Sequence, residues 1–387
     1  MLPLLIVLSP FMQIGLTYYL SVHALLMVLS TGYLVRCFTR TGGVGIGFGW
    51  FLLLVGFMFS SILFVDGVRT EDLLRGGREL LSLIVIVLWC VAVRTQVVSL
   101  ERVSVTLVRQ VLLLVSTLMF FLSLIQTVFL SRGVYVGLSQ DWFVINTATL
   151  PSYLDLMYSR IRPMGTFGEP SYLSAFSLIL LFAIRERIFS DRRWAVIALC
   201  LTFCVLLSRS FSGIFWLALG SCLYLFRIRA YKALIWIGGL ALVGTFASVL
   251  FVPEVWGRAM SILSGNDPSF NIRILAPLHA VPAILAYDPF GIPPRLFHEF
   301  GGLANFSISD TVLVQNGLLN IVITYGVLGI ACLVALLYFF RGGEYFWLLM
   351  VLGFQNGSFL SFDKVVMVAI ALMGASVLSS NRVGRAE

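Results

Sequence analysis

Residues Arg160–Tyr172 read RIRPMGTFGEPSY and lie between two long apolar segments. The stretch holds two arginines, one glutamate, two glycines and two prolines. Glycine and proline at this density indicate a shaped, irregular backbone rather than a continuing helix. Charged side chains on such a backbone, at the edge of apolar segments, are costly and are therefore candidates for function. The alternative is a connecting loop whose arginines only contact lipid headgroups.

The composition around this stretch is that of a membrane protein. Of the 387 residues, 59% are hydrophobic and 11% are charged, whereas soluble domains have roughly 45–50% and about 25%. Because backbone polar groups must be satisfied inside a bilayer, we expect an all-α polytopic protein that forms a single transmembrane helical domain over residues 1–387. The net charge of +8 does not indicate nucleic-acid binding, since the basic residues are scattered between apolar runs.

We expect about twelve transmembrane helices, from apolar runs near the length that spans a bilayer. They cover residues 2–15, 18–35, 48–65, 80–98, 110–130, 171–184, 194–208, 211–226, 233–252, 312–338, 345–361 and 365–380. The apolar N-terminus lacks a basic region and a clear cleavage site, so it is taken as the first helix. The six cysteines lie inside apolar segments and are interpreted as core residues, not as a disulfide framework.

The loop charges predict the orientation. If the N-terminus is cytoplasmic, the inside loops are strongly basic and the outside loops are close to neutral, as the positive-inside rule requires. Both termini are then cytoplasmic, and two long loops, 131–170 and 253–311, face the periplasm. We expect short helices in these loops: one at 152–158, one near 254–263 and one that starts at 266–268, followed by a rigid turn over 287–294.

Several ionisable residues lie near outer span ends, and each has a structural alternative. Arg209, in a tight turn, either extends to lipid phosphates or points a guanidinium into a central cavity. Arg273 could pair with an acid of its own loop, His279 and His298 could be hydrogen-bonded loop residues, and Asp310 could cap a helix. No nucleotide-binding loop, metal motif or hydrolase triad is present. Outer arginines with one or two carboxylates suit a large anionic, lipid-linked substrate handled without a metal.

The sequence resembles the superfamily of O-antigen polymerases (Wzy) and O-antigen ligases, over roughly residues 160–330. Residues 162–172 look like its Arg-x-x-Gly-Thr-Phe-x-Glu-Pro-Ser motif, and 208–210 look like its Ser-Arg-Ser turn. The pattern from Arg273 to the Pro289-Phe-Gly291 triplet, and that from Gln315-Asn316 to Gly326-Val-Leu-Gly329, are similar to two further motifs. The ligases have His where this chain has Gln315, which cannot act as a base. The polymerase branch is therefore favoured, with a GT-C-like architecture.

The resemblance implies a repeat-unit polymerase of the bacterial inner membrane. Such an enzyme joins undecaprenyl-diphosphate-linked oligosaccharides on the periplasmic face by metal-independent, inverting glycosyl transfer, without a cofactor. The reaction needs a base and cations for the leaving diphosphate. We expect Arg162, Arg209 and Arg273 to bind the diphosphate, and Glu169 to be the base, with Asp310 and His298 as further catalytic candidates. The secondary site candidates are Arg160, Tyr172, His279, Arg295, Gln315 and Asn316.

The implied partners are the lipid-linked donor and acceptor, membrane lipid and, as a candidate, a chain-length regulator of the Wzz type. Two alternatives remain open. One is an O-antigen ligase that transfers polysaccharide to the lipid A core. The other, from a different class, is a flippase for lipid-linked oligosaccharides, although its short loops do not match the long outer loops here. The sugars and the linkage do not follow from the sequence.

Overall fold

The computed structural model describes residues 1–16, 21–41, 46–63, 70–95, 104–134, 136–138, 162–230, 260–261, 264, 274–292, 316–354 and 359–380. These residues form helices joined by turns, which agrees with the predicted all-α membrane class. Four helices are long and apolar enough to cross a membrane, with windows at Val22–Thr39, Thr70–Arg94, Val105–Leu130 and Gly317–Phe339, and shorter apolar helices accompany them.

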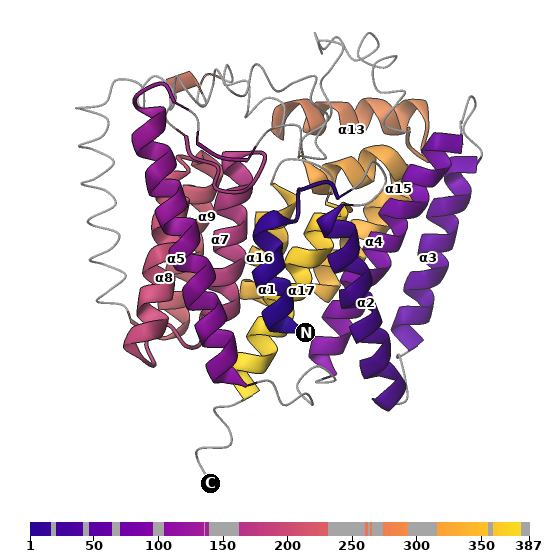
Figure 1. Ribbon diagram of the computed structural model, residues 1–387. Helices are drawn as coiled ribbons and strands as arrows, with labels where there is room; N and C mark the ends of the chain where they lie inside the picture. Colours follow the sequence, from indigo (N-terminus) through magenta and orange to yellow (C-terminus); the bar gives the residue numbers. More distant parts are fainter. Residues whose placement is uncertain are drawn as a thin grey trace. The chain divides into compact units, whose positions relative to one another are not determined.

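The contacts within the chain define two compact units. Figure 1 labels their helices along the chain. The first comprises residues 1–55, 77–217 and 360–387, and the second comprises 56–76 and 218–359. Helices of the first unit are α1 (Leu2–Leu8), α2 (Val22–Thr41), α5 (Val105–Leu130), α7 (Pro170–Ile184), α8 (Arg192–Leu207) and α17 (Phe362–Ser380). Helices of the second are α13 (Ala276–Tyr287), α15 (Gly317–Phe339) and α16 (Gly343–Gly353). Residues of α3 (Ile46–Leu63), α4 (Thr70–Arg94) and α9 (Phe211–Arg227) are divided between the two.

Each predicted span overlaps a described helix, except 233–252, which lies outside the described residues. The loop helix predicted at 152–158 also lies outside them. Of the helix predicted to start at 266 and to end at the turn from 287, residues 274–287 are described; they are helical and include α13 (Ala276–Tyr287). Of the helix predicted near 254–263, only residues 260–261 and 264 are described, and 260–261 are helical. The turn predicted after residue 287 is present: Gly291 N–H donates to the Asp288 carbonyl at 3.1 Å, and Phe290 N–H donates to Asp288 Oδ1 at 2.8 Å.

The first predicted span is much shorter than expected. Helix α1 has seven residues and continues only as a 3-10 turn over Ser9–Phe11. Seven helical residues rise about 10 Å, well short of a hydrocarbon core of about 30 Å. Pro10 has no backbone N–H and so cannot donate a helical hydrogen bond. Its carbonyl accepts a hydrogen bond from the Thr166 hydroxyl. The segment after α1 therefore contacts and holds the 162–169 loop.

The core of the first unit is built around α7 and α17. Helix α7 packs against α8 and α17, and α17 also packs against α2 and α1. Every residue of α7 except Leu181 is buried, as expected for a helix that is apolar on all sides. Small residues permit this: an added Cβ at Gly374 would lie 2.7 Å from the Ala183 Cβ. Close approach at small residues is typical of helix packing in membranes.

In the second unit, α15 is broken where the sequence predicted one continuous span. Gly326 has φ 56° and ψ −130° in the middle of the helix, a conformation open essentially to glycine alone. The turn after α13 supplies the missing partners: Val327 N–H donates to the Pro289 carbonyl and Ile292 N–H donates to the Ile323 carbonyl, both at 2.9 Å. The 289–291 and 326–329 motifs therefore pack directly against each other. Neither Gly291 nor Gly326 has room for a side chain there.

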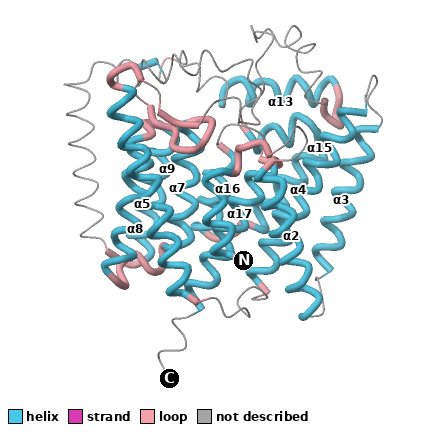
Figure 2. Tube along the Cα trace, in the orientation of Figure 1, coloured by secondary structure: helices cyan, strands magenta, loops and turns pink. Residues whose placement is uncertain are grey.

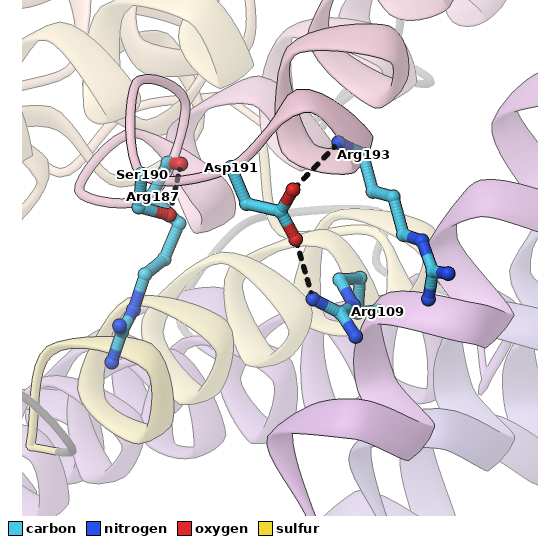
Figure 3. Close-up of polar contacts among 5 residues, drawn as sticks. All are labelled: Arg109, Arg187, Ser190, Asp191 and Arg193. Carbon is cyan, nitrogen blue, oxygen red and sulfur yellow. Dashed lines mark hydrogen bonds and ion pairs between the residues drawn. The ribbon is translucent and has the colours of Figure 1, made fainter.

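At one end of the first unit, an aspartate joins α5 and α8 (Figure 3). Asp191 caps α8 by accepting from the Arg193 backbone N–H at 3.4 Å, and its other oxygen lies 2.7 Å from Arg109 Nη1. The side chains of this pair are 22% and 40% exposed, so the pair contributes only about 0–1 kcal/mol. The candidate site lies at the opposite end of α8.

Candidate functional site

The loop at residues 162–169 is held by one buried glutamine of α5. Gln126 Oε1 accepts from the backbone N–H groups of Met164 at 3.1 Å and Gly165 at 2.7 Å, and its Nε2 donates to the Gly165 carbonyl at 2.8 Å. Gln126 is 1% exposed. Gly165 has φ +63° and opens a turn that the Phe167 N–H closes on the Met164 carbonyl at 3.1 Å. Positive φ at that turn position favours glycine.

The other end of the loop is fixed to the N-terminal segment and the core. Gln13 Oε1 accepts from the Gly168 N–H at 2.7 Å, and the Thr166 hydroxyl donates to the Pro10 carbonyl. Phe167 is fully buried, with its ring 5.4 Å from the ring of Phe176 on α7. The loop thus enters α7 in a defined geometry, with its polar backbone satisfied by side chains from distant segments. Figure 2 draws the described loops and turns in pink between the cyan helices.

Glu169 occupies the N-cap position of α7, ahead of Pro170, but its side chain does not cap the helix. One carboxylate oxygen, Oε2, accepts from the Ser171 hydroxyl at 2.7 Å. Glu169 is 5% exposed. A carboxylate is among the groups that act as general bases, and the start of α7 fixes the position of this one.

The Arg162 side chain contacts the turn after α8 that carries Arg209. The Arg162 Nε donates to the Ser208 carbonyl at 3.3 Å, and Ser208 immediately precedes Arg209. The Arg162 guanidinium of the 162–169 loop therefore lies beside the backbone turn from which the Arg209 side chain extends. Guanidinium groups bind phosphate oxygens through two parallel hydrogen bonds, so a pair of them can hold a diphosphate.

Arg209 has an unusual backbone for its residue type. Its φ is +47°, the left-handed conformation in which helices commonly end with glycine. The flanking hydroxyls support this turn: Ser208 Oγ accepts from the Ser210 N–H at 3.3 Å, and Ser210 Oγ accepts from the Gly213 N–H at 3.4 Å. The Arg209 side chain is exposed while both serines are buried. The Ser-Arg-Ser sequence thus keeps an arginine in a costly conformation.

Two charged residues of this region were not among the sequence candidates. Lys364, at the start of α17, is fully buried, and its Nζ lies 4.6 Å from the centroid of the Tyr172 ring on α7. Its Nζ is also 3.9 Å from Asp363 Oδ2. A signal existed, because both residues stand at the outer start of the last predicted span and only two of the 26 basic residues are lysines. Gln126 carried no signal, since its partners lie 38 and 39 residues away.

The remaining sequence candidates belong to the second unit or lie outside the described residues. Asn316 caps α15 in the second unit, with its Oδ1 accepting from the N–H groups of Leu318 at 3.1 Å and Leu319 at 3.0 Å. His279 is exposed on α13. Six candidates lie outside the described residues: Arg160, Arg273, Arg295, His298, Asp310 and Gln315. Within the described part of the chain, no group of three or more His, Cys, Asp or Glu side chains could hold a metal ion.

The apolar helices indicate a polytopic membrane protein, whose first unit has a buried carboxylate at the start of α7 and arginines in the preceding loop and after α8. A comparison with protein families narrows this class of membrane protein to one family. The family model described as WcaD colanic acid polymerase matches residues 72–375, so the chain belongs to this family of polysaccharide polymerases. No curated protein and no solved structure matches the chain.

Proposed function

We propose that the chain polymerises polysaccharide repeat units that are carried on undecaprenyl diphosphate. The family match supports the polymerase class. The observation that supports the site assignment is the contact of the Arg162 guanidinium with the Ser208 carbonyl, immediately before Arg209. This contact joins the turn after α8 to the loop that leads into Glu169 at the start of α7. The name of the matching family makes a repeat unit of the colanic acid type the first substrate to test.

The proposed reaction is an inverting glycosyl transfer in one displacement. A hydroxyl oxygen of the acceptor, a single lipid-linked repeat unit, attacks the anomeric carbon of the growing glycan. A new glycosidic C–O bond forms while the bond from that carbon to the diphosphate oxygen breaks, and undecaprenyl diphosphate leaves with the electron pair. The hydroxyl proton passes to the Glu169 carboxylate. Inversion follows because attack and departure occur on opposite faces of the sugar.

The arginines act on the leaving group. Negative charge grows on the diphosphate as the bond breaks, and donors already oriented toward it stabilise the transition state more than the ground state. Arg162 and Arg209 have this role in the proposal, with Arg273 as a third diphosphate ligand. Their delocalised positive charges would allow the reaction to proceed without a metal ion.

The membrane arrangement is part of the proposal. The chain would span the inner membrane about twelve times as one domain, with both termini in the cytoplasm and the site facing the periplasm. The basic loop at the Asp191 end of α8 would then be cytoplasmic, and the 162–169 loop would be periplasmic. A chain-length regulator would act on this face.

Glu169→Gln tests the base assignment, because it keeps the Ser171 contact possible while removing the proton acceptor. In the host deleted for this gene, we expect the variant to reach the membrane at the wild-type level and to lose polymer by about 100–10,000-fold. Ser171→Ala is the matched control, which removes the hydrogen bond and leaves the carboxylate. Full polymerisation by the Glu169 variant would move the base to Asp310 or His298.

A further inference from the structure

Lys364 is the only basic side chain that the fold buries among the described residues. A charged group inside a membrane bundle is expensive, and such groups are retained where they serve a function. Lysine also stands out in this chain, which uses arginine for nearly all of its basic positions. Lysine differs from arginine in carrying a compact charge on a flexible stem. Its place at the start of α17 therefore calls for a physical explanation.

The contacts of Lys364 connect two helices. Its Nζ lies 4.6 Å from the centroid of the Tyr172 ring, a cation–π distance, and α17 packs along α7. Such a contact is strongest where water is excluded, and Tyr172 is 8% exposed. The ammonium thus holds the aromatic ring against the start of α17.

Tyr172 belongs to the same helical turn as Glu169. The Tyr172 N–H donates to the Glu169 carbonyl at 3.1 Å, and residues three apart lie on the same face of a helix. The loop before Glu169 is fixed by Gln126 and Gln13. The Lys364 contact fixes the turn after it.

We propose that Lys364 is a positioning residue of the polymerase site. Through the Tyr172 ring it holds the first turn of α7, and with it the Glu169 carboxylate, in the geometry that proton transfer requires. This inference rests on the proposed function of Glu169. Displacing a catalytic group by about 1 Å can cost about 100-fold in rate, so a contact one turn away can control kcat.

The competing explanation is that Lys364 only neutralises its neighbour Asp363, whose Oδ2 lies 3.9 Å away. The double variant Asp363→Asn with Lys364→Met separates the two explanations, because it removes both charges and leaves no unpaired buried carboxylate. The single variant Lys364→Met leaves Asp363 without this cation and is expected to accumulate less in the membrane. Lys232→Met, at the other lysine of the chain, is the matched control.

The measurement is steady-state polymerisation by purified protein in liposomes, with the lipid-linked repeat unit extracted from the host. We expect the double variant to accumulate as the wild type does, with kcat lowered about 100-fold and KM within about twofold. A loss of folded protein would lower the amount of active enzyme and would not produce this split at equal folded concentration. Wild-type kcat in the double variant would assign Lys364 to charge neutralisation and overturn the proposal.

Coupling to Tyr172 gives a second, independent readout. Tyr172→Leu should lower kcat by a similar factor, and adding it to the double variant should lower kcat no further, because both changes break the same contact. Losses that multiply would contradict a path through Tyr172. If the wild-type protein forms no polymer, the proposed function fails; if the wild type polymerises and the double variant does so equally, only this inference fails.

Discussion

Replacing Arg209 by glycine should keep or raise the free energy of unfolding and should strongly lower the rate of polymerisation. Arg209 follows α8 with φ +47°, a conformation that costs a side-chain-bearing residue about 1–2 kcal/mol and glycine nothing. Glycine also gains about 0.5–1 kcal/mol of freedom in the unfolded chain. The net change in the free energy of unfolding should therefore lie between zero and about +1.5 kcal/mol.

The catalytic effect has the opposite sign. If the Arg209 guanidinium stabilises the leaving diphosphate, its loss should lower kcat by about 100- to 1000-fold, which raises the barrier by roughly 2.7–4 kcal/mol. An arginine that only contacts lipid headgroups would cost little, since exposed charge contacts contribute at most about 1 kcal/mol. The loss of kcat expected for a diphosphate ligand is therefore much larger than the loss expected for a contact with lipid headgroups.

Arg229 provides an internal control. It follows α9 with φ +56°, and its N–H donates to the Phe226 carbonyl at 3.1 Å, as the Arg209 N–H does to the Leu206 carbonyl. Arg229→Gly should match Arg209→Gly in thermal unfolding while keeping full polymerisation. The assay combines melting in detergent with kcat in liposomes. Wild-type kcat in the Arg209 variant, or an equal loss in the Arg229 variant, would refute the diphosphate role.

Two further substitutions test the scaffold. Gln126→Leu leaves two backbone N–H groups and one carbonyl of the 164–165 turn without their buried partner, so the free energy of unfolding should fall by about 3 kcal/mol, whereas Thr127→Val should cost less than about 1 kcal/mol. Gly326→Ala forces a Cβ into the 289–291 turn at a backbone conformation closed to alanine, and should lower the melting temperature by an amount that corresponds to about 3 kcal/mol or more. Gly32→Ala, where an added Cβ meets open space inside a helix, should raise it slightly. An unchanged melting temperature for either scaffold variant would contradict the assigned contacts.

The sequence predicted the helices well because hydropathy reports burial in lipid directly. Helix α7 was predicted at 171–184 and begins at Pro170, where proline at the first helical position and the preceding glycines mark the boundary. The break at Gly326 was missed for a physical reason. Gly-Val-Leu-Gly inside an apolar run has the hydropathy of a continuous span, and only the contact with a turn 35 or more residues earlier reveals the break.

The residues of the candidate site also differ in whether local sequence or only a long-range contact reveals them. Arg162, Glu169 and Arg209 stand in short motifs that interrupt apolar runs, so local composition identifies them. Gln126 and Lys364 act through long-range contacts with α7 and its loop, which composition does not encode. Asn316 was also singled out by its motif, and the structure shows that its Oδ1 caps α15.

The central claim is that the chain joins lipid-linked repeat units, and reconstitution tests it most directly. Purified wild-type protein in liposomes would receive the lipid-linked repeat unit in the presence of EDTA, and the products would be resolved by size. The proposed function predicts a ladder spaced by one repeat unit, with one undecaprenyl diphosphate released for each bond formed. Repeat units that cross the bilayer without forming longer chains would contradict the claim and indicate a transporter.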